Sequence, residues 1–364
     1  MPRTPMIKFG IVGLGRGSAY FSLNHVEGAK VEAICDIDKK LLEECGKAHG
    51  IPERYTSYEE MLDSDIDAVV VATPISLHAQ QSIKALDAGM HVLSEVPAVA
   101  KIEECRALAE AVERNGKKYM MAENYCYMKE VVLLKELVAA GKFGELYFGE
   151  GEYIHDCKEM FRYPDGTLTW RGLWAQESNG NVYPTHSLGP LYQMFGERVV
   201  SVVCLGSGVH TIPGTKLEDS TLTLCKTESG KLLKLRFDIV SNRPHNTCYY
   251  SLQGTKGCYE APRGLGDDHK VWFADDHKRY EWRPLRDYEE RFLPEEWRHP
   301  PEEAMKAGHW GSDFFVMRDF IQCVLQDRKP PIDVYDALNM TAPGLASQES
   351  IAKGGALVEI PDFK

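Results

Sequence analysis

The stretch Gly10-Ile11-Val12-Gly13-Leu14-Gly15-Arg16-Gly17-Ser18 ends one apolar strand pattern and begins a helix. Glycines at such a junction let the backbone turn tightly and approach a bound phosphate closely. The match to the usual G-x-G-x-x-G/A spacing is imperfect, because Ser18 stands at the third position and Gly17 one place earlier. Taken alone, this pattern is also typical of a Gly-rich turn that binds no ligand.

An acidic residue strengthens the interpretation of the glycine turn. Asp36 ends the next strand pattern, roughly twenty residues after Gly13, where a carboxylate accepts hydrogen bonds from the ribose diol of an adenosine. The same carboxylate would repel a 2′-phosphate, so NAD is favoured over NADP. Asp36 could instead cap the following helix, although Asp38 could also fill that role. Strand, glycine turn, helix and acidic strand end together predict a dinucleotide site, in which Arg16 lies along the pyrophosphate or in solvent.

The first third of the chain alternates strand and helix patterns. Strands are predicted at 7–12, 31–35, 68–72, 91–93 and 119–122, and helices at 39–48, 78–88 and 102–114. Such alternation predicts a parallel sheet that is covered on both faces. We therefore expect an α/β fold whose N-terminal part, residues 1–124, is a Rossmann domain with a doubly wound parallel sheet that binds NAD.

The pattern changes after residue 145. Strands are predicted at 146–153, 199–205, 220–225, 232–240 and 247–252 without intervening helices, followed by helices at 310–325 and 335–352. This order predicts that residues 125–364 form an α+β domain with a large open, mostly antiparallel sheet, used for substrate binding and oligomerisation. Residues 283–303 are rich in charge, Pro and Trp and are expected to form a long surface loop or lid.

Composition narrows the classes of partner. The 364 residues include 42 Lys and Arg against 54 Asp and Glu, which gives a net charge of −12 and argues against broad binding of nucleic acid or anionic membranes. The ten cysteines are scattered without Cys-x-x-Cys or zinc-like spacing, so we expect buried reduced thiols and no metal site. Without an apolar leader or a run of membrane-spanning length, the sequence predicts a cytoplasmic protein.

A second motif follows the nucleotide-binding half. In Asn181-Val182-Tyr183-Pro184-Thr185-His186, a Tyr and a His stand three residues apart, a spacing that puts both on one face of a helical turn. Histidine titrates near neutral pH, whereas tyrosine must be shifted or must act as a hydrogen-bond donor. The motif therefore predicts a pair of proton-handling groups, although a buried Tyr or His is more often a satisfied core residue.

Two further motifs carry a family resemblance. With Thr73-Pro74-x-x-x-His78 and Ser94-Glu95-Val96-Pro97, the chain resembles the Gfo/Idh/MocA oxidoreductase family over nearly its whole length. Most sugar and inositol dehydrogenases of that family have Glu-Lys-Pro where this chain has Glu95-Val96-Pro97, and their Lys serves proton transfer. Val96 cannot pass a proton, which argues against an ordinary dehydrogenase mechanism.

The chain is more similar to the NAD-dependent glycoside hydrolases built on this fold, typified by α-N-acetylgalactosaminidases, in which Glu-Val-Pro recurs. The similar segments are 120–124, 149–156, 170–171, 180–190, 253–257, 342–344 and 354–356. One departure is Gly308-His309-Trp310-Gly311-Ser312-Asp313, where those enzymes tend to have His-Gly-Gly-Met-Asp. Their specificity for an aminosugar is therefore not carried over.

The resemblance implies hydrolysis through a transient redox cycle. NAD⁺ takes a hydride from C3 of the sugar, the ketone acidifies the C2 hydrogen, the C1 group is eliminated, water adds, and the hydride returns. The catalytic residues that we predict are His186, Tyr183, Tyr153, His155, Arg171 and Glu123. From the glycine turn, Asp36 and the resemblance together, the predicted cofactor-binding residues are Gly13, Leu14, Gly15, Arg16, Gly17, Asp36, Thr73, Pro74, His78, Glu95 and Asn124.

The roles are only partly fixed. His186 is the natural partner of the C3 hydroxyl, and Tyr153 and His155, two apart on a strand, serve the C2 proton and the leaving group in either order. Arg171 lowers the pKa of Tyr183 or pairs with Glu177. Glu123 is placed near the nicotinamide or the sugar. The tryptophans that stack on a sugar or pack inside are Trp170, Trp174 and Trp310.

Two other functions compete with the glycosidase. A conventional NAD-dependent sugar or polyol dehydrogenase would use His186 in place of the missing Lys. A catalytically idle NAD-binding sensor would need no proton-handling groups. In each case we expect a small-molecule carbohydrate ligand and a homo-oligomer.

Overall fold

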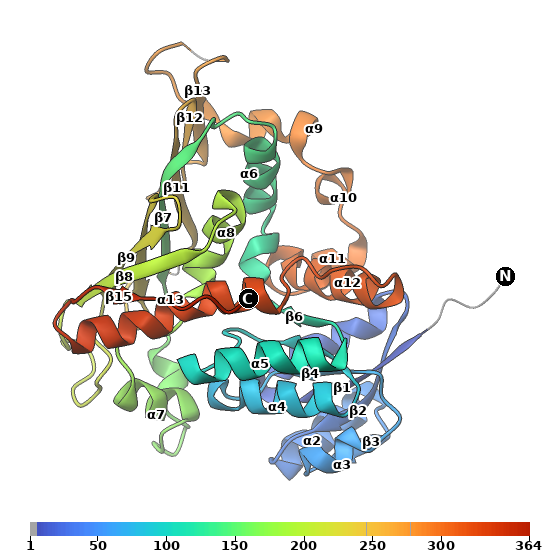
Figure 1. Ribbon diagram of the computed structural model, residues 1–364. Coiled ribbons are helices and arrows are strands. Elements are labelled where there is room, and N and C mark those ends of the chain that lie inside the picture. Colours follow the sequence, from blue (N-terminus) through green and yellow to red (C-terminus); the bar gives the residue numbers. More distant parts are fainter. Residues whose placement is uncertain (1–5, 245, 277) are drawn as a thin grey trace. The chain divides into compact units, whose positions relative to one another are not determined.

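The computed structural model describes residues 6–244, 246–276 and 278–364 (Figure 1). Its contacts divide the chain into two compact units. The first unit joins residues 1–127, 300–338 and 363–364, and the second joins residues 128–299 and 339–362. The expected boundary between residues 124 and 125 is a single cut in the sequence, whereas these units collect segments that are distant along the chain.

The first unit is built on a six-stranded sheet with the order β3-β2-β1-β4-β5-β6, in which all neighbouring pairs are parallel. Its strands are β1 (Ile7–Val12), β2 (Ala29–Cys35), β3 (Glu53–Tyr55), β4 (Ala68–Val71), β5 (His91–Ser94) and β6 (Tyr119–Met121). The chain adds β2 and β3 on one side of β1, and β4 to β6 on the other. The predicted doubly wound Rossmann fold is thus confirmed, with its switch point between β1 and β4.

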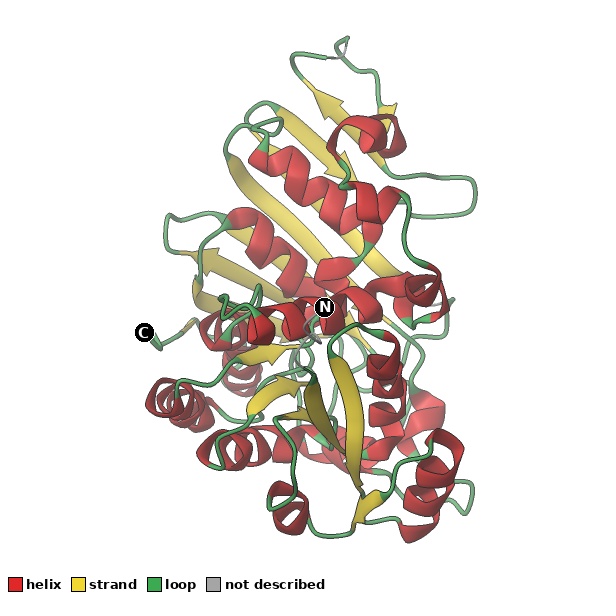
Figure 2. Cartoon of the chain, turned by 90° about the vertical axis from the view of Figure 1, so that its right-hand side faces the viewer, coloured by secondary structure: helices red, strands yellow, loops and turns green. Residues whose placement is uncertain are grey.

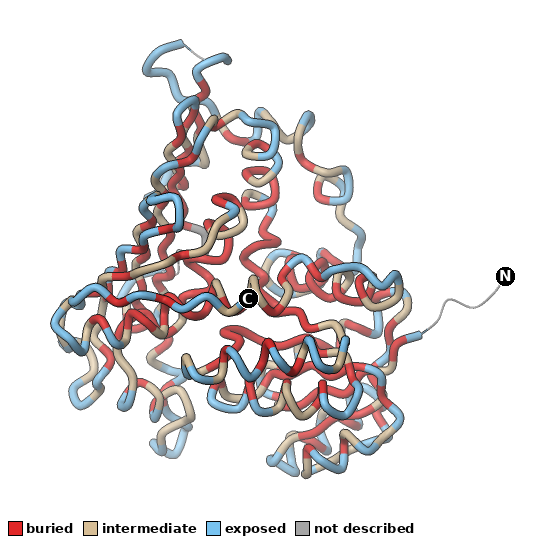
Figure 3. Tube along the Cα trace, in the orientation of Figure 1, coloured by how far each residue is buried: buried red, intermediate tan, exposed pale blue. Residues whose placement is uncertain are grey.

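Helices cover this sheet, which explains its apolar strands. All four residues of β4, Ala-Val-Val-Val, are buried, as expected for a parallel strand covered on both faces. The helices α4 (Ile75–Asp87) and α5 (Ile102–Asn115) pack against each other. The segment η1 (Ser18–His25) packs against β2 and α12 (Ser312–Leu325). Buried residues run along the strands of each sheet (Figure 3).

The second unit is built on a nine-stranded sheet with the order β14-β13-β12-β11-β7-β10-β9-β8-β15. Its strands are β7 (Leu146–Ile154), β8 (Val199–Gly206), β9 (Thr221–Thr227), β10 (Leu232–Asp238), β11 (Asn246–Gly254), β12 (Gly257–Glu260), β13 (Lys270–Phe273), β14 (Arg283–Pro284) and β15 (Val358–Glu359). Strands β7 and β10 pair in parallel, and the other neighbours are antiparallel. This confirms the predicted open, mostly antiparallel sheet.

Helices lie on one face of this sheet (Figure 2). The helices α6 (Lys129–Ala139) and α8 (Thr185–Phe195) pack against each other, and α8 lies on β7, β10 and β11. Along β9, buried and exposed residues alternate, which is the pattern of a strand with one covered and one uncovered face.

The sequence interpretation was wrong in two places, and it also missed α6, for which no helix was predicted. Between β7 and β8 the chain forms α7 (Trp170–Glu177) and α8, where we expected no helix. Gly189 and Pro190 inside α8 lower its intrinsic helix propensity, which hid the pattern. Residues 283–303 are not one long loop, because they form β14, η4 (Leu285–Tyr288), α9 (Glu289–Phe292), α10 (Glu295–Arg298) and the start of α11 (Glu302–Lys306).

Short elements also escaped detection. The strand β3 has three residues, Glu-Arg-Tyr, and α3 (Tyr58–Leu62) has five, so neither shows a measurable period. Within the described ranges, no helix combines the length and the apolar character needed to cross a membrane.

Candidate functional site

The glycine turn after β1 leaves its backbone open. Gly13 has φ 87° in the left-handed region, and a Cβ there would lie 2.7 Å from the Ala72 carbonyl oxygen, so only glycine fits. A Cβ on Gly15 would meet no atom within 4 Å among the described residues. The turn therefore packs tightly on the β4 side and has free space along α1 (Leu14–Gly17), as a phosphate-binding turn requires.

Asp36 holds this turn from the end of β2. Its Oδ2 accepts a hydrogen bond from the Leu14 amide at 2.7 Å, and its Oδ1 accepts one from the Asp38 amide at 2.9 Å. Asp38, not Asp36, caps α2 (Lys39–His49), because its side chain accepts from the amides of Lys40 and Leu41. Ile37 is 91% exposed beside Asp36, where an apolar side chain suits an adenine face. These features fit an adenosine at this strand end.

The Arg16 guanidinium lies in an ion-pair network with two carboxylates. Its Nε is 2.6 Å from Glu95 Oε1, and its Nη2 is 3.2 Å from Asp313 Oδ2. Tyr20 donates to the same Glu95 oxygen at 2.7 Å. Burial raises the pKa of Tyr20 well above its ordinary value, and the Glu95 charge raises it further, so the phenol stays protonated.

His78 is a buried brace at 1% exposure. Its Nε2 lies 2.8 Å from the Thr73 carbonyl oxygen, and its Nδ1 lies 2.8 Å from the Pro97 carbonyl oxygen. Thr73 also donates to Gln81 at 2.5 Å, and Pro74 begins α4. His78 therefore joins the loop after β4 to the segment after β5 and stabilises the loops at the carboxyl ends of these strands.

Glu123 and Asn124 follow β6 and are both buried. Glu123 Oε1 accepts from the Tyr125 amide at 3.0 Å, and Asn124 Nδ2 donates to Asp313 Oδ1 at 2.8 Å. Burial would raise the pKa of Asp313, but His309, Arg16 and Asn124 together lower it strongly.

The predicted cofactor residues gather at one edge of the first unit. Asp36, Thr73, Glu95 and Asn124 follow the carboxyl ends of parallel strands, where Rossmann folds bind their ligands. Sequence reasoning missed Tyr20, His309 and Asp313 as members of this network. Arg16 and Asp313 are 297 positions apart, and no local pattern signals such a contact.

A different group of side chains gathers in the second unit. We call Tyr153, His155, Tyr183 and His186 the Tyr–His cluster. Ring centroids are 5.0 Å apart for Tyr153 and His186, 5.0 Å for Tyr183 and His186, and 5.8 Å for the two tyrosines. The Tyr153 hydroxyl lies 3.2 Å from His155 Nδ1. The structure thus brings together four of the six predicted catalytic residues.

Glycines in β7 make this cluster possible. A Cβ on Gly151 would lie 2.1 Å from the Ser187 carbonyl oxygen, and one on Gly149 would lie 2.9 Å from the Phe195 ring. Helix α8 therefore rests directly on the strand backbone, which brings His186 beside Tyr153. The Tyr250 hydroxyl donates to the His186 carbonyl oxygen and fixes the start of the helix.

The segment before α8 is held from α13 (Val334–Ala352). A Cβ on Gly344 would lie 2.5 Å from the Asn181 carbonyl oxygen, so the helix offers no side chain at this contact. The Asn181 amide donates to Ser347 Oγ at 2.8 Å. These contacts set the position from which Tyr183 reaches the cluster.

Arg171 reaches the same region from α7. Burial raises the pKa of Cys157 to about 11, and the positive charge of Arg171 opposes part of this rise. Cys157 Sγ is in turn 3.1 Å from His155 Nδ1. Arg171 stacks over the Trp170 ring at 4.3 Å and forms no ion pair with Glu177 in the part of the chain that is described.

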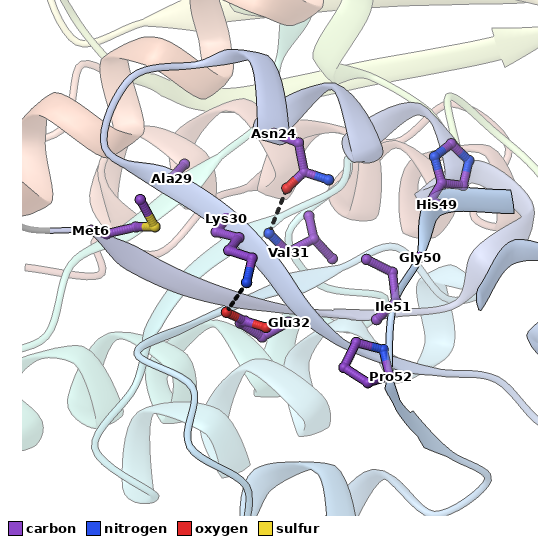
Figure 4. Close-up of a pocket in the computed structure, with 10 residues that line it drawn as sticks. All are labelled: Met6, Asn24, Ala29, Lys30, Val31, Glu32, His49, Gly50, Ile51 and Pro52. Carbon is purple, nitrogen blue, oxygen red and sulfur yellow. Dashed lines mark hydrogen bonds and ion pairs between the residues drawn. The ribbon is translucent and has the colours of Figure 1, made fainter. Parts of the chain in front are cut away.

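A surface pocket of about 470 Å³ lies elsewhere in the first unit (Figure 4). It sits at the start of β2, the edge opposite to the carboxyl ends of the strands. Its polar groups pair with one another, because Asn24 accepts from the Val31 amide at 2.8 Å and Lys30 pairs with Glu32 at 2.6 Å. This pocket is therefore not the dinucleotide site.

Comparison with known proteins shows which family the chain belongs to. Residues 7–123 match the model "Oxidoreductase family, NAD-binding Rossmann fold", residues 131–260 match "GFO/IDH/MocA C-terminal domain", and residues 214–364 match "Glycosyl hydrolase 109, C-terminal domain". A "Glycosyl hydrolase family 109 protein" of Solibacter usitatus is 31% identical over 98% of this chain and 88% of the relative. The chain belongs to glycosyl hydrolase family 109.

Other relatives agree with this placement. The family 109 chain is 30% identical to an alpha-N-acetylgalactosaminidase of Shewanella oneidensis, over 100% of its own length and 86% of the relative. A levoglucosan dehydrogenase in complex with NADH has a TM-score of 0.82 at 22% identity, covering 98% of this chain and 99% of that one. A scyllo-inositol dehydrogenase of Lactobacillus casei has a TM-score of 0.75 at 20% identity, covering 98% and 99%. At these identities the dehydrogenases show a shared fold.

The cofactor of this family 109 chain is NAD, since its first unit is an NAD-binding Rossmann domain. The open glycine turn and the carboxylate of Asp36 fit the pyrophosphate and the adenosine ribose. Among the residues described, no three His, Cys, Asp or Glu side chains converge as metal ligands.

Proposed function

We propose that this family 109 chain cleaves a glycoside by transient oxidation of the sugar at C3, elimination at C1, addition of water and reduction. The observation that carries the proposal is the Tyr–His cluster, which gathers several proton-handling groups on one helix start and one strand. An ordinary dehydrogenation needs one proton acceptor, whereas this cycle needs groups for the C3 hydroxyl, the C2 hydrogen and the leaving group.

Gly13, Gly15 and Asp36 would hold the dinucleotide. Bound NAD⁺ supplies a reversible hydride acceptor, so the sugar is oxidised and later reduced without net redox change. Asp36 would accept hydrogen bonds from the ribose hydroxyls through the lone pairs that the amides of Leu14 and Asp38 do not use. After β5, Val96 cannot carry a proton, so the proton transfers of the cycle need other side chains.

His186 is the group that we assign to the C3 hydroxyl. It is 7% exposed and is enclosed by the rings of Tyr153 and Tyr183. Accepting the hydroxyl proton as C3 becomes a ketone makes the alkoxide available for hydride loss, and returning that proton closes the cycle. The Tyr250 hydrogen bond to its carbonyl oxygen keeps this residue in position.

Tyr153, Tyr183 and His155 would handle the C2 proton and the departing oxygen. The 3.2 Å contact between the Tyr153 hydroxyl and His155 Nδ1 allows a proton to pass between them. The positive charge of Arg171, which acts on the Cys157 thiol beside His155, would stabilise the enolate that forms when C2 loses its proton. Water addition at C1 then needs the same groups in reverse.

The substrate that we propose is a sugar glycoside. The name of the Shewanella oneidensis relative makes an α-N-acetylgalactosaminide the first compound to test. The alternative is a sugar or polyol dehydrogenase, which would release reduced cofactor and would need no leaving group at C1.

One experiment separates the two reactions. The purified protein with NAD⁺ is incubated with 4-nitrophenyl glycosides in deuterated water, while nitrophenol and NADH absorbance are followed. We expect nitrophenol release without net NADH, together with deuterium at C2 of the released sugar. Accumulating NADH without cleavage identifies the dehydrogenase, and the absence of both reactions with bound NAD identifies the sensor.

We also propose that the chain forms a homo-oligomer through the uncovered face of its second sheet. Exposed leucines gather on three neighbouring strands of that face, namely Leu205, Leu222, Leu224 and Leu232. Exposed leucines that gather on neighbouring strands are typical of an interaction surface. Light scattering of wild type and of the Leu222→Glu, Leu224→Glu double variant tests this, and a wild-type monomer contradicts it.

A cytoplasmic location is proposed as well. The nine cysteines whose side chains are described form no disulfide with one another, which suits a reducing compartment. Cell fractionation with an antibody to the protein tests the location.

A further inference from the structure

A strained turn in the first unit presents a tryptophan to solvent. His309, Trp310 and Gly311 have φ values of 52°, 54° and 92°, so three consecutive residues are left-handed. Glycine adopts this conformation readily, whereas a bulky side chain rarely does. Yet Trp310 keeps its indole 78% exposed, so burial of the ring does not compensate for the strain.

Several contacts hold the turn in this shape. His309 Nδ1 lies 3.1 Å and 3.0 Å from the two carboxylate oxygens of Asp313. Ser312 Oγ donates to the His309 carbonyl oxygen at 2.8 Å, and the Gly311 amide donates to that of Gly308 at 3.1 Å. Strain that the surroundings enforce in this way is typical of functional sites.

The turn stands at the ligand edge of the Rossmann sheet. The Asp313 carboxylate that holds His309 also binds Arg16 and Asn124, and Arg16 binds Glu95. Glu95 and Asn124 follow β5 and β6, whereas Asp36 follows β2 on the other side of the glycine turn. A dinucleotide whose adenosine is held by Asp36 would therefore extend its nicotinamide toward the β5 and β6 side, where the Trp310 turn is held by Asp313.

This position defines what the indole can meet. Hydride transfer requires C3 of the sugar to contact the nicotinamide. The sugar must therefore lie on the β5 and β6 side as well. The adenine would lie on the opposite side, next to the exposed Ile37. An indole offers a flat apolar surface of the kind that the hydrogen-bearing face of a pyranose covers.

We propose that Trp310 is a stacking platform for the sugar ring of the substrate and so determines specificity. The inference relies on the proposed function only in taking a pyranose as the ligand. The contacts of the turn hold its backbone in place before the sugar arrives, which lowers the entropy cost of stacking.

The test measures sugar binding without turnover. Protein loaded with NADH is titrated with a panel of methyl hexopyranosides by calorimetry, and the tightest of these is then used on the variants. We expect Trp310→Gly to weaken its Kd roughly tenfold, while Trp310→Phe stays within about threefold of wild type. Trp310→Gly should not lower Tm, because glycine accepts the left-handed backbone, so a folding defect does not explain the loss.

The chain offers a matched control. Tyr280 is also a large aromatic residue with positive φ, 69°, and is 84% exposed, in the turn between β13 and β14. Tyr280→Gly should leave the sugar Kd unchanged. Sugar binding that Trp310→Gly leaves intact, or no binding by any panel member, overturns the platform.

Two further outcomes separate the alternatives. If Trp310→Gly weakens only 4-nitrophenyl glycosides and not methyl glycosides, the indole stacks on the aglycone and the proposal is overturned. If methyl glycosides bind through Trp310 and no glycoside is cleaved, the platform stands and the glycosidase proposal fails.

Discussion

The ring of His186 meets the ring of Tyr153 edge to face, with centroids 5.0 Å apart and planes inclined by 68°. His186 comes from the start of α8 and Tyr153 from β7, and no side chain separates helix from strand at Gly151. The mutual position of these rings is therefore set by backbone packing, which makes it stiff.

Removal of the imidazole tests its role directly. His186→Ala should lower kcat by about 10²- to 10⁴-fold, because a general acid–base group contributes that much, while the Kd for NAD⁺ stays unchanged. His210→Ala is the matched control, since His210 is exposed in the connection between β8 and β9. Weaker NAD⁺ binding by His186→Ala would count against the assigned role.

The glycine contact between β7 and α8 makes a stability prediction. Gly151→Ala places a methyl group where the Ser187 carbonyl oxygen already lies, so the helix must shift, at a cost of about 1–3 kcal/mol. Thermal unfolding should show a lower Tm, and activity should fall because His186 moves with α8. Gly264→Ala, where a Cβ meets no described atom within 4 Å, should change neither quantity.

Cofactor preference should follow Asp36. Asp36→Asn removes the negative charge that repels a 2′-phosphate, so the ratio of the NADP⁺ to the NAD⁺ Kd should fall by about tenfold or more. Asp38→Ala removes a helix cap and should cost about 1 kcal/mol of stability without altering this ratio. An unchanged ratio in Asp36→Asn would place the adenosine elsewhere.

Acid should weaken the network around Asp313. Its pKa in the folded chain is lowered by His309, Arg16 and Asn124 despite burial, so the contribution is full above the ordinary carboxyl pKa of about 4 and is lost as the pH falls further. Asp313→Asn should be less stable than wild type at pH 7 and should lose less stability between pH 5 and pH 3. Urea unfolding at several pH values measures both, and parallel curves would contradict the assignment.

The sequence predicted those parts of the fold that repeat a local period. The alternation of apolar strands and helices predicted the parallel sheet, and Gly13 together with Asp36 predicted the dinucleotide site at the end of β1 and β2. The segment β3, with only Glu-Arg-Tyr, and α8, with Pro190 inside it, carry no clear period and were missed. The partners of Arg16 could not be predicted, because Glu95 and Asp313 meet it only through tertiary packing.

The gathering of Tyr153, His155, Tyr183 and His186 was partly visible in advance. Spacings of two on a strand and three on a helical turn placed each pair on one face. That the pairs would meet depended on α8 lying on β7, which no spacing encodes. Cys157, which contacts His155, carried no signal in the sequence.

The parallel pairing of β7 and β10 has a consequence for how this protein can vary. Two neighbouring strands that run the same way need a long crossover, and here α7, α8, β8 and β9 form it. Shortening that connection would remove α8 and, with it, His186. New substrate preferences should therefore arise by insertion into peripheral turns such as residues 207–219. Such a turn can become longer while the strands at the centre of the sheet stay unchanged.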